Sequence, residues 1–175
     1  MEVWKSCKFS DEIISGNLDV SKFAVELHNI LDGDADKSYL DPKSFLENTY
    51  LTESMKIILK DSLLRLKDGK GQPVHVLDTS FGGGKTHSLV LLYHIFKNKD
   101  LGTKYISSYD FKKQFNIESV PDASMVCIDC RRITKKTLWG EIANSLKKYD
   151  VFKKFDDDKI PPQNIADIKA LLDKP

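Results

Sequence analysis

Eight residues in the middle of the chain have the types and the spacing of a phosphate-binding loop. They read Thr79-Ser80-Phe81-Gly82-Gly83-Gly84-Lys85-Thr86. This run matches the pattern G-x-x-x-x-G-K-S/T at every position except the first, where threonine replaces glycine. In such a loop the backbone N–H groups turn inward around phosphate oxygens at the start of a helix. Three consecutive glycines permit that backbone and let a phosphate come close, so the run predicts a site for the phosphates of a nucleotide.

Two side chains of the loop complete the predicted site. Lys85 is placed to reach the β- and γ-phosphates, and the hydroxyl of Thr86 is placed to hold Mg²⁺. ATP and Mg²⁺ are therefore the expected cofactors, although the pattern does not specify the base. The alternative is a glycine-rich turn without a ligand, but a position between a strand and a helix favours phosphate binding. The predicted nucleotide-binding residues are Thr79, Ser80, Phe81, Gly82, Gly83, Gly84, Lys85, Thr86 and His87, with Thr86 as the magnesium ligand.

Hydrolysis of a nucleotide needs further groups, above all an acid at the end of a later strand that holds Mg²⁺ and helps to place water. Asp129 ends the next apolar run after the loop, but it stands there alone. Two interpretations stay open: Asp129 is linked to the metal, or it caps the turn that follows its strand. We expect this chain by itself to bind ATP without efficient hydrolysis, and the sequence assigns no catalytic residue.

Other residues that could bind a metal or DNA are more simply explained by structural roles. Cys127 and Cys130 form a C-x-x-C pair, but residues three apart on a strand face opposite sides, and no second pair completes a zinc site. Positive charges gather over residues 131–136, where the alternatives are a solvated helix entrance and a contact to DNA. His87 and His94 have no spacing that suggests a shared metal, which favours packing or hydrogen-bonding roles.

The loop needs a strand before it and a helix after it. Residues 74–78 are a short β-rich run, and residues 125–129 are a second one. The segment 85–98 is apolar nearly all round, a pattern typical of a helix buried on several sides. Alternation of strands and helices indicates an α/β fold with parallel strands. We predict a fragment of a P-loop NTPase of AAA+-like type, with a mainly helical segment over 1–51 and the first part of the NTPase domain over 52–175.

Apolar spacing and helix-end signals predict the remaining helices. Asp41 is a good N-cap, and Pro42 is suited to the first helical position. Thr52 caps a helix that runs to Lys67, with Glu53 in its first turn, before glycines and a proline end it. Further helices are expected over residues 21–31, around 110–115, over 135–149 and after the proline pair 161–162.

Length and composition set the outer bounds. The chain has 175 residues, room for one core, and a formal net charge of +1, so a nucleic-acid or membrane partner would need a local patch. No run approaches the roughly 18 apolar residues that a membrane-spanning helix needs, and the N-terminus does not resemble a signal peptide. Three cysteines fit a reducing compartment, and we expect the cytoplasm. Strands that are apolar on both faces need neighbours, so another copy of the chain is an expected partner.

Several stretches of the sequence occur together in one family. They are residues 45–52 (FLENTYLT), 77–89 (LDTSFGGGKTHSL) and 137–143 (TLWGEIA), with 11–16 (DEIISG) and 23–27 (FAVEL) near the start. In these stretches the chain resembles a family of predicted AAA+ ATPases catalogued as domain of unknown function four-ninety-nine. The likeness spans nearly the whole chain, and the run F-G-G-G-K-T-H is fairly specific.

The resemblance implies a large multidomain ATPase of which this chain is the N-terminal part. Such proteins are similar to origin-recognition and STAND-type ATPases and are often associated with prokaryotic DNA modification and phage defence. It therefore implies DNA as a partner through the rest of the protein, and it makes Thr79 at the first loop position unremarkable. By analogy, the segment 49–52 lines the adenine pocket. The Walker B strand, the sensor residues and the arginine finger are expected beyond Pro175.

Two other functions share the loop and stay as alternatives. A small-molecule or nucleotide kinase needs lid arginines, for which Arg131 and Arg132 are the available cluster. A non-catalytic interaction module would bind nucleotide or nothing and use its helices to dock partners. We rank the ATP-binding module of an ATPase first and expect no membrane partner.

Overall fold

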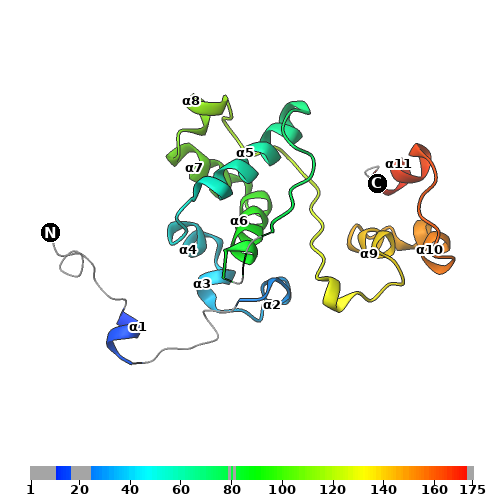
Figure 1. The fold of residues 1–175 in the computed structure, drawn as a ribbon, viewed down its shortest axis with the longest axis horizontal. Coiled ribbons are helices and arrows are strands. Elements are labelled where there is room, and N and C mark those ends of the chain that lie inside the picture. The colour runs from blue at the N-terminus through cyan, green and yellow to red at the C-terminus, as the bar shows by residue number, and fades with distance from the viewer. Residues whose placement is uncertain (1–10, 17–24, 79, 81, 173–175) are drawn as a thin grey trace.

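The computed structural model describes residues 11–16, 25–78, 80 and 82–172. Over these ranges the chain forms helices joined by non-helical connections (Figure 1). The helices are α1 (Asp11–Ile14), α2 (Leu27–Asp32), α3 (Lys37–Leu40), α4 (Pro42–Glu47), α5 (Glu53–Asp68), α6 (Lys85–Lys97), α7 (Lys99–Ser108), α8 (Phe111–Phe115), the 3₁₀ helix η3 (Cys130–Arg132), α9 (Leu138–Ser145), α10 (Tyr149–Asp157) and α11 (Ile165–Leu172).

The α/β fold expected from the sequence is wrong for this structure. None of the residues that the structure describes belongs to a β-strand, so these ranges contain no parallel sheet and do not form a P-loop NTPase fold. Residues 74–78 and 125–129, both expected as strands, are connections between helices. Val74 and Val76 are 73% and 83% exposed, so the first of these segments is not buried as the strand of a parallel sheet would be.

The physical reason lies in what a strand requires. A strand is made by hydrogen bonds to a neighbouring backbone, whereas a short apolar run only shows that side chains favour burial. Residues 125–129 satisfy that preference in another way, because Met125 and Cys127 pack against the helical core. Pairing with a second copy of the chain, which the exposed side chains of Val74 and Val76 would allow, stays a prediction.

The main core surrounds α6. A helix that is apolar on most of its surface needs neighbours on most of its sides, and α2, α4 and α7 all lie against α6. Its buried side chains include Val90, Leu91 and Ile95. They join a larger cluster with apolar residues of α4, α5, α7, α8 and the chain after α8: Phe45, Leu46, Met55, Leu59, Leu63, Tyr105, Ile106, Phe111, Ile117 and Val120. The prediction of a largely buried helix after the loop is confirmed.

Helix ends follow the predicted capping chemistry at two places. The side chain of Asp41 accepts a hydrogen bond from the backbone N–H of Ser44 (2.7 Å), and Pro42 opens α4. Thr52 accepts from the N–H of Met55 (3.3 Å) and opens α5. A hydroxyl or carboxylate oxygen at the N-cap satisfies one of the N–H groups that the first turn leaves without a partner. The helices predicted from Asp41–Pro42 and from Thr52 are therefore confirmed.

Other predicted helices differ in extent. The helix expected over 21–31 is helical only from Leu27 within the described residues, because Val25 and Glu26 lie outside α2. The helix expected over 135–149 is divided into α9 and the start of α10, with Lys147 between them at a φ of 58°. The helix expected around 110–115 is present as α8, but the ten-residue helix α7 before it was not expected.

Helices α9, α10 and α11 form a group of their own at one side of the molecule (Figure 1). They share a small core of Ala143, Phe152 and Leu171. Asp156 of α10 is fully buried and accepts a hydrogen bond from the hydroxyl of Thr137 (2.6 Å), the residue that caps α9. A buried carboxylate is tolerated only when hydrogen bonds satisfy it, so this contact holds the two helices in register.

No helix in the described part of the chain combines the length and the apolar character that crossing a bilayer requires.

Gly71 provides a test of the turn that carries the chain from α5 toward the loop. Its φ is 75°, and a Cβ there would lie 2.3 Å from the backbone oxygen of Asp61. Gly71→Ala should therefore lower the free energy of unfolding by about 2–4 kcal/mol, from the left-handed backbone and the clash together. Gly69→Ala is the matched control, because Gly69 has a φ of 74° but open space around it, and should cost only about 1–2 kcal/mol. Urea denaturation followed by circular dichroism measures both, and equal losses would contradict this packing.

Candidate functional site

The loop before α6 adopts left-handed backbone angles at two of its glycines. Gly82 and Gly84 have φ angles of 80° and 77°, in the left-handed region where a side chain is strained. The N–H of Gly83 donates to the carbonyl oxygen of Ser80 (3.1 Å), which closes a tight turn. A Cβ at Gly82 or Gly84 would meet nothing within 4 Å, so these glycines are required by backbone angle and not by crowding.

The first turn of α6 has no side-chain cap. Its N-cap is Gly84, which offers no side-chain acceptor. The first hydrogen bond within the helix runs from the N–H of Ser88 to the oxygen of Gly84 (2.9 Å). Helix geometry leaves the N–H groups of the preceding residues, Thr86 and His87 among them, without an acceptor inside the helix. These groups and the positive end of the helix dipole form the kind of surface that binds an anion.

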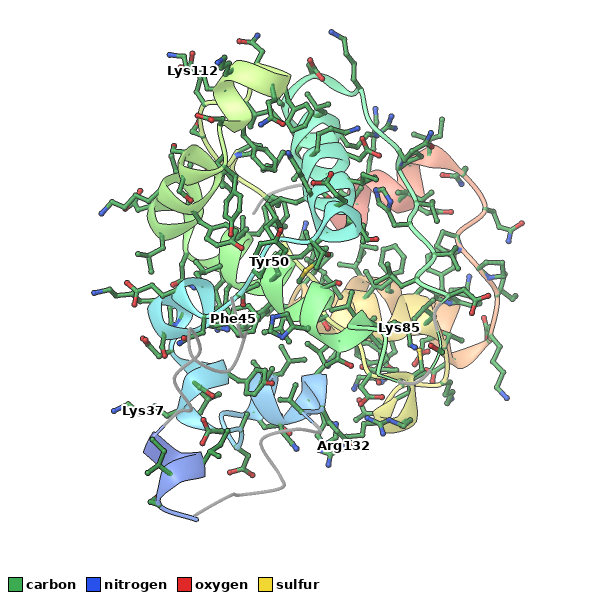
Figure 2. All side chains as sticks on the ribbon, turned by 60° about the vertical axis from the view of Figure 1, so that its left-hand side comes forward. Lys37, Phe45, Tyr50, Lys85, Lys112 and Arg132 are labelled. Atoms are coloured by element: carbon green, nitrogen blue, oxygen red, sulfur yellow. The ribbon has the colours of Figure 1, made fainter. Side chains whose placement is uncertain are left out.

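Lys85 lies on the loop that precedes it. Its Nζ atom donates a hydrogen bond to the carbonyl oxygen of Ser80 (3.0 Å), and Figure 2 shows the residue where α6 begins. The ammonium group is thus held against the backbone of the loop. Gly82, Gly83 and Gly84 are exposed, and Thr86 is half-buried. Of the predicted site residues, Thr79 and Phe81 lie outside the described residues.

His87 faces the protein interior. Its Nε2 lies 3.0 Å from the hydroxyl oxygen of Thr49, and its ring packs on Phe45 with centroids 4.7 Å apart. The Thr49 hydroxyl donates its only proton to the carbonyl oxygen of Phe45 (2.7 Å), so it accepts from His87 Nε2, which carries the ring proton. Burial lowers the pKa of His87, and the ring is neutral at pH 7. Its side chain therefore anchors the first turn of α6.

The segment 49–51 is held beside α6 by two tyrosines of the neighbouring helix region. Tyr105 donates its hydroxyl to the carbonyl oxygen of Thr49 (3.1 Å), and the N–H of Leu51 donates to the hydroxyl of Tyr109 (3.4 Å). Between them Tyr50 is 81% exposed. This segment is part of the family resemblance, but the sequence does not reveal that Thr49 is the hydrogen-bonding partner of His87.

Asp129 belongs to a charge network. Its carboxylate accepts hydrogen bonds from the backbone N–H of Arg131 (3.0 Å) and from the Arg131 guanidinium (2.8 Å), and it lies 3.1 Å from His28 Nδ1. Nη1 and Nη2 of the same guanidinium each donate to one carboxylate oxygen of Glu26, at 3.1 Å. Arg132 extends the network to Asp32 on α2 (3.2 Å; Figure 2). The interpretation of Asp129 as a cap for the following turn is the one that this geometry supports.

This network joins two segments that are far apart in the sequence. Glu26 and His28 come from the start of α2, and Asp129 and Arg131 come from the η3 turn, about a hundred residues later. The guanidinium of Arg131 holds the pKa of Asp129 far below its usual range, and the same pairing lowers the pKa of Glu26. No sequence pattern predicts these partners, because nothing local links His28 to an acid 101 residues away.

Cys127 and Cys130 lie in different environments. Cys127 is half-buried against the core, and burial raises the pKa of its thiol. Cys130 is exposed at the start of η3. Within the ranges that the structure describes, no three His, Cys, Asp or Glu side chains come together as a metal-binding group.

Comparison with protein families gives one match. The family model described as DUF499 N-terminal domain matches residues 1–122, that is 122 of the 175 residues. The chain belongs to this family. No curated protein and no solved structure matches it.

The DUF499 N-terminal domain covers the main core and the loop. The match ends after α8, so it includes α5, α6 and the residues 80–86, whereas η3 and the α9–α11 group lie outside it. The resemblance noted in the sequence is therefore confirmed as to family. It carries no activity with it, so any function has to be argued from the loop and its surroundings.

The charge network around Asp129 predicts a pH dependence of stability. Because the pKa of Asp129 is lower in the folded chain than in the unfolded one, its ion pair stabilises the fold fully above about pH 4 and progressively less as the pH falls below that. Asp129→Asn should therefore lower the Tm at neutral pH, and its Tm should approach that of the wild type at acidic pH. Thermal denaturation monitored over this pH range measures the convergence.

Asp34→Asn is the control for this experiment. Asp34 is an exposed carboxylate whose side chain makes no hydrogen bond or ion pair with another described residue. The Tm difference between Asp34→Asn and the wild type should be small and should not change with pH. A constant Tm difference for Asp129→Asn at all pH values would show that the network does not control acid stability.

Proposed function

We propose that this chain is the nucleotide-binding part of an ATPase and that it holds the phosphates of ATP at the start of α6. The observation that carries the proposal is the glycine-capped first turn of α6. Its N–H groups face a loop with two left-handed glycines, and the Lys85 ammonium lies across that loop. A polyphosphate supplies the anionic acceptors that this combination of N–H groups, helix dipole and lysine favours.

Each group has a separate task in this proposal. The N–H groups of the loop and the first turn contact phosphate oxygens, and Lys85 exchanges its bond to the Ser80 carbonyl for a stronger, charge-assisted bond to phosphate. Thr86 offers its hydroxyl to Mg²⁺. His87 keeps the first turn in place through Thr49 and Phe45, so it acts on the ligand through position and not through contact.

The family resemblance supports the choice of ATP over other phosphates. The run F-G-G-G-K-T-H is part of the sequence likeness to a family of predicted ATPases, and the DUF499 N-terminal domain match includes it. Which groups catalyse hydrolysis is a separate matter, because Asp129 is already bonded to Arg131 and lies close to His28. We therefore propose binding as the function of these residues and assign no catalytic acid.

Lys85→Ala tests the proposal directly. A charge-assisted hydrogen bond to phosphate is worth about 1.5–3 kcal/mol, so the Kd for ATP should rise about 10- to 150-fold. Isothermal titration calorimetry with ATP, ADP, AMP and adenosine measures the change, and affinity should depend on the β- and γ-phosphates. Lys104→Ala, which removes an exposed lysine of α7, is the control and should leave the Kd unchanged. Absence of saturable binding of ATP to the wild type would remove the proposal.

Thr86 provides an independent test through the metal. If its hydroxyl holds Mg²⁺, Thr86→Val should reduce the gain in ATP affinity that Mg²⁺ gives, whereas Thr86→Ser should preserve it, because only the first variant lacks the oxygen. The measurement is the ATP affinity of each variant with Mg²⁺ and with EDTA. An unchanged Mg²⁺ effect in Thr86→Val would assign the metal to other ligands.

A further inference from the structure

The first turn of α6, which carries the proposed phosphate site, is hydrogen-bonded to the chain that follows α4. Within this turn the Ser88 hydroxyl donates back to the carbonyl oxygen of Gly84 (2.9 Å). The ring of His87 instead reaches out of the helix to the hydroxyl of Thr49, two residues after the end of α4 (3.0 Å). This bond therefore links the start of α6 to a segment 38 residues earlier in the sequence.

Thr49 is itself fixed by hydrogen bonds from its other polar groups. Its hydroxyl donates to the carbonyl oxygen of Phe45 (2.7 Å), and its backbone N–H donates to that of Leu46 (3.3 Å). Its own carbonyl oxygen accepts a bond from the hydroxyl of Tyr105, a buried residue of α7 (3.1 Å). Thr49 is 5% exposed. A buried group with all its hydrogen bonds satisfied is rigid, so the acceptor for His87 has a fixed position.

The hydrogen bond gives the His87 ring a direction that packing does not. The ring lies against Phe45 with centroids 4.7 Å apart, and it meets Tyr39 edge-on at 6.3 Å. Apolar contact is non-directional, so the ring and the turn that carries it can slide along these surfaces. A hydrogen bond weakens steeply when its angle departs from linear. The bond to Thr49 therefore sets the orientation of the first turn of α6.

The glycines before α6 contribute little to this orientation. Gly82, Gly83 and Gly84 are exposed, and a Cβ at Gly82 or at Gly84 would meet nothing within 4 Å. Gly84 also provides no side-chain cap. A binding site needs its groups held within about 0.5 Å of the productive geometry. The N–H groups at the start of α6 therefore depend on the contacts that hold the helix from its buried side.

We infer that Thr49 is a positioning residue of the phosphate site, which acts through His87 without contacting the ligand, and that Tyr105 supports it from α7. The inference rests on the proposed function, because it concerns the affinity of that site. Without the hydrogen bond, a smaller fraction of molecules has the first turn of α6 in the binding geometry. The apparent Kd rises in inverse proportion to that fraction. Since the first turn contacts phosphate and not the base, ligands that share the same phosphates lose affinity by the same factor.

The test is isothermal titration calorimetry of the full chain in Mg²⁺ with two probes, ADP and pyrophosphate, of which the second has no base. Thr49→Val keeps the shape of the side chain and removes its hydroxyl. The Kd should rise about three- to tenfold, by the same factor for both probes. Thr49→Ser, which retains the hydroxyl, should bind both probes within about twofold of the wild type.

Two further variants separate positioning from a general loss of stability. Tyr105→Phe removes the hydroxyl that bonds to the Thr49 carbonyl, and it should raise both Kd values by a smaller factor. Thr137→Val is the matched control, because Thr137 is also buried and its hydroxyl donates to Asp156 in the α9–α11 group (2.6 Å). This variant should lower the Tm and leave both Kd values unchanged.

The ¹⁵N spectrum of the His87 ring reports the hydrogen bond without any ligand. In the wild type Nε2 carries the proton, because Thr49 accepts from it. Thr49→Val removes this acceptor, so the ratio of the two neutral tautomers should change, whereas Thr49→Ser should preserve it. A ring spectrum that is the same in Thr49→Val and the wild type would overturn the inference.

The binding data distinguish this inference from the proposed function. If the wild type binds both probes and Thr49→Val leaves both Kd values unchanged, the inference fails and the proposed function stands. A rise for ADP alone, or a wild type that binds ADP and not pyrophosphate, also overturns the inference, because affinity would then depend on the base. Equal rises in Thr49→Val and Thr137→Val would reduce the effect to lost stability.

Two remaining outcomes are also decisive. If Thr49→Val does not fold, unchanged Kd values in Tyr105→Phe overturn the inference. If the wild type binds neither probe, the proposed function fails and this inference fails with it.

Discussion

The fold depends on the burial of one helix. Helix α6 is apolar on most of its surface, and a helix of this kind is stable in water only when other elements cover it. Helices α2, α4 and α7 lie against it, and side chains of α5 join the same core. Because the polar ends of a helix cannot be covered in the same way, both ends of α6 reach the surface. The loop proposed to bind phosphate lies at one of these ends.

The aromatic cluster on α4 connects the two ends of α6. Phe45 is almost fully buried and packs on His87 at 4.7 Å and on His94 at 5.1 Å, so one ring contacts two residues of α6 that lie about two turns apart. His87 fixes the first turn through Thr49, and His94 fixes a later turn through the backbone of Tyr39. Two neutral imidazoles therefore hold α6 to the neighbouring chain by hydrogen bonds within a largely apolar core. This cluster, and not a side-chain cap, therefore holds the start of α6.

Caps and apolar spacing predicted much of the helical structure, and short sequence stretches predicted the family. The caps at Asp41 and Thr52 and the apolar surface of α6 are properties of short stretches, and the structure has them where the sequence placed them. The sheet could not be predicted in this way. Apolar runs at 74–78 and 125–129 favour burial, but a strand also needs a distant backbone as partner, and neither run has one in the described residues. The partnership of Asp129 with Arg131 and His28 is partly non-local in the same sense, since His28 lies 101 residues away in sequence.

The candidate phosphate site is predictable as a pattern, but its supports are not. The glycine and lysine spacing alone selects residues 79–86, whereas the contact of His87 with Thr49 depends on how α4 packs on α6. No geometry in the loop supplies the identity of the nucleotide, so ATP is part of the proposal. The central claim is therefore narrow: the uncapped N–H groups at the start of α6 bind phosphate.

The most direct measurement of this claim is the change in backbone amide shifts when ADP and Mg²⁺ are titrated into ¹⁵N-labelled chain. The account predicts saturable downfield shifts that are largest at Gly83, Gly84 and Thr86, because amide protons move downfield when they donate to phosphate, with smaller changes at Ser88, whose N–H already bonds to Gly84. Shifts that are absent from these residues, or that are largest elsewhere while the nucleotide binds, would contradict it.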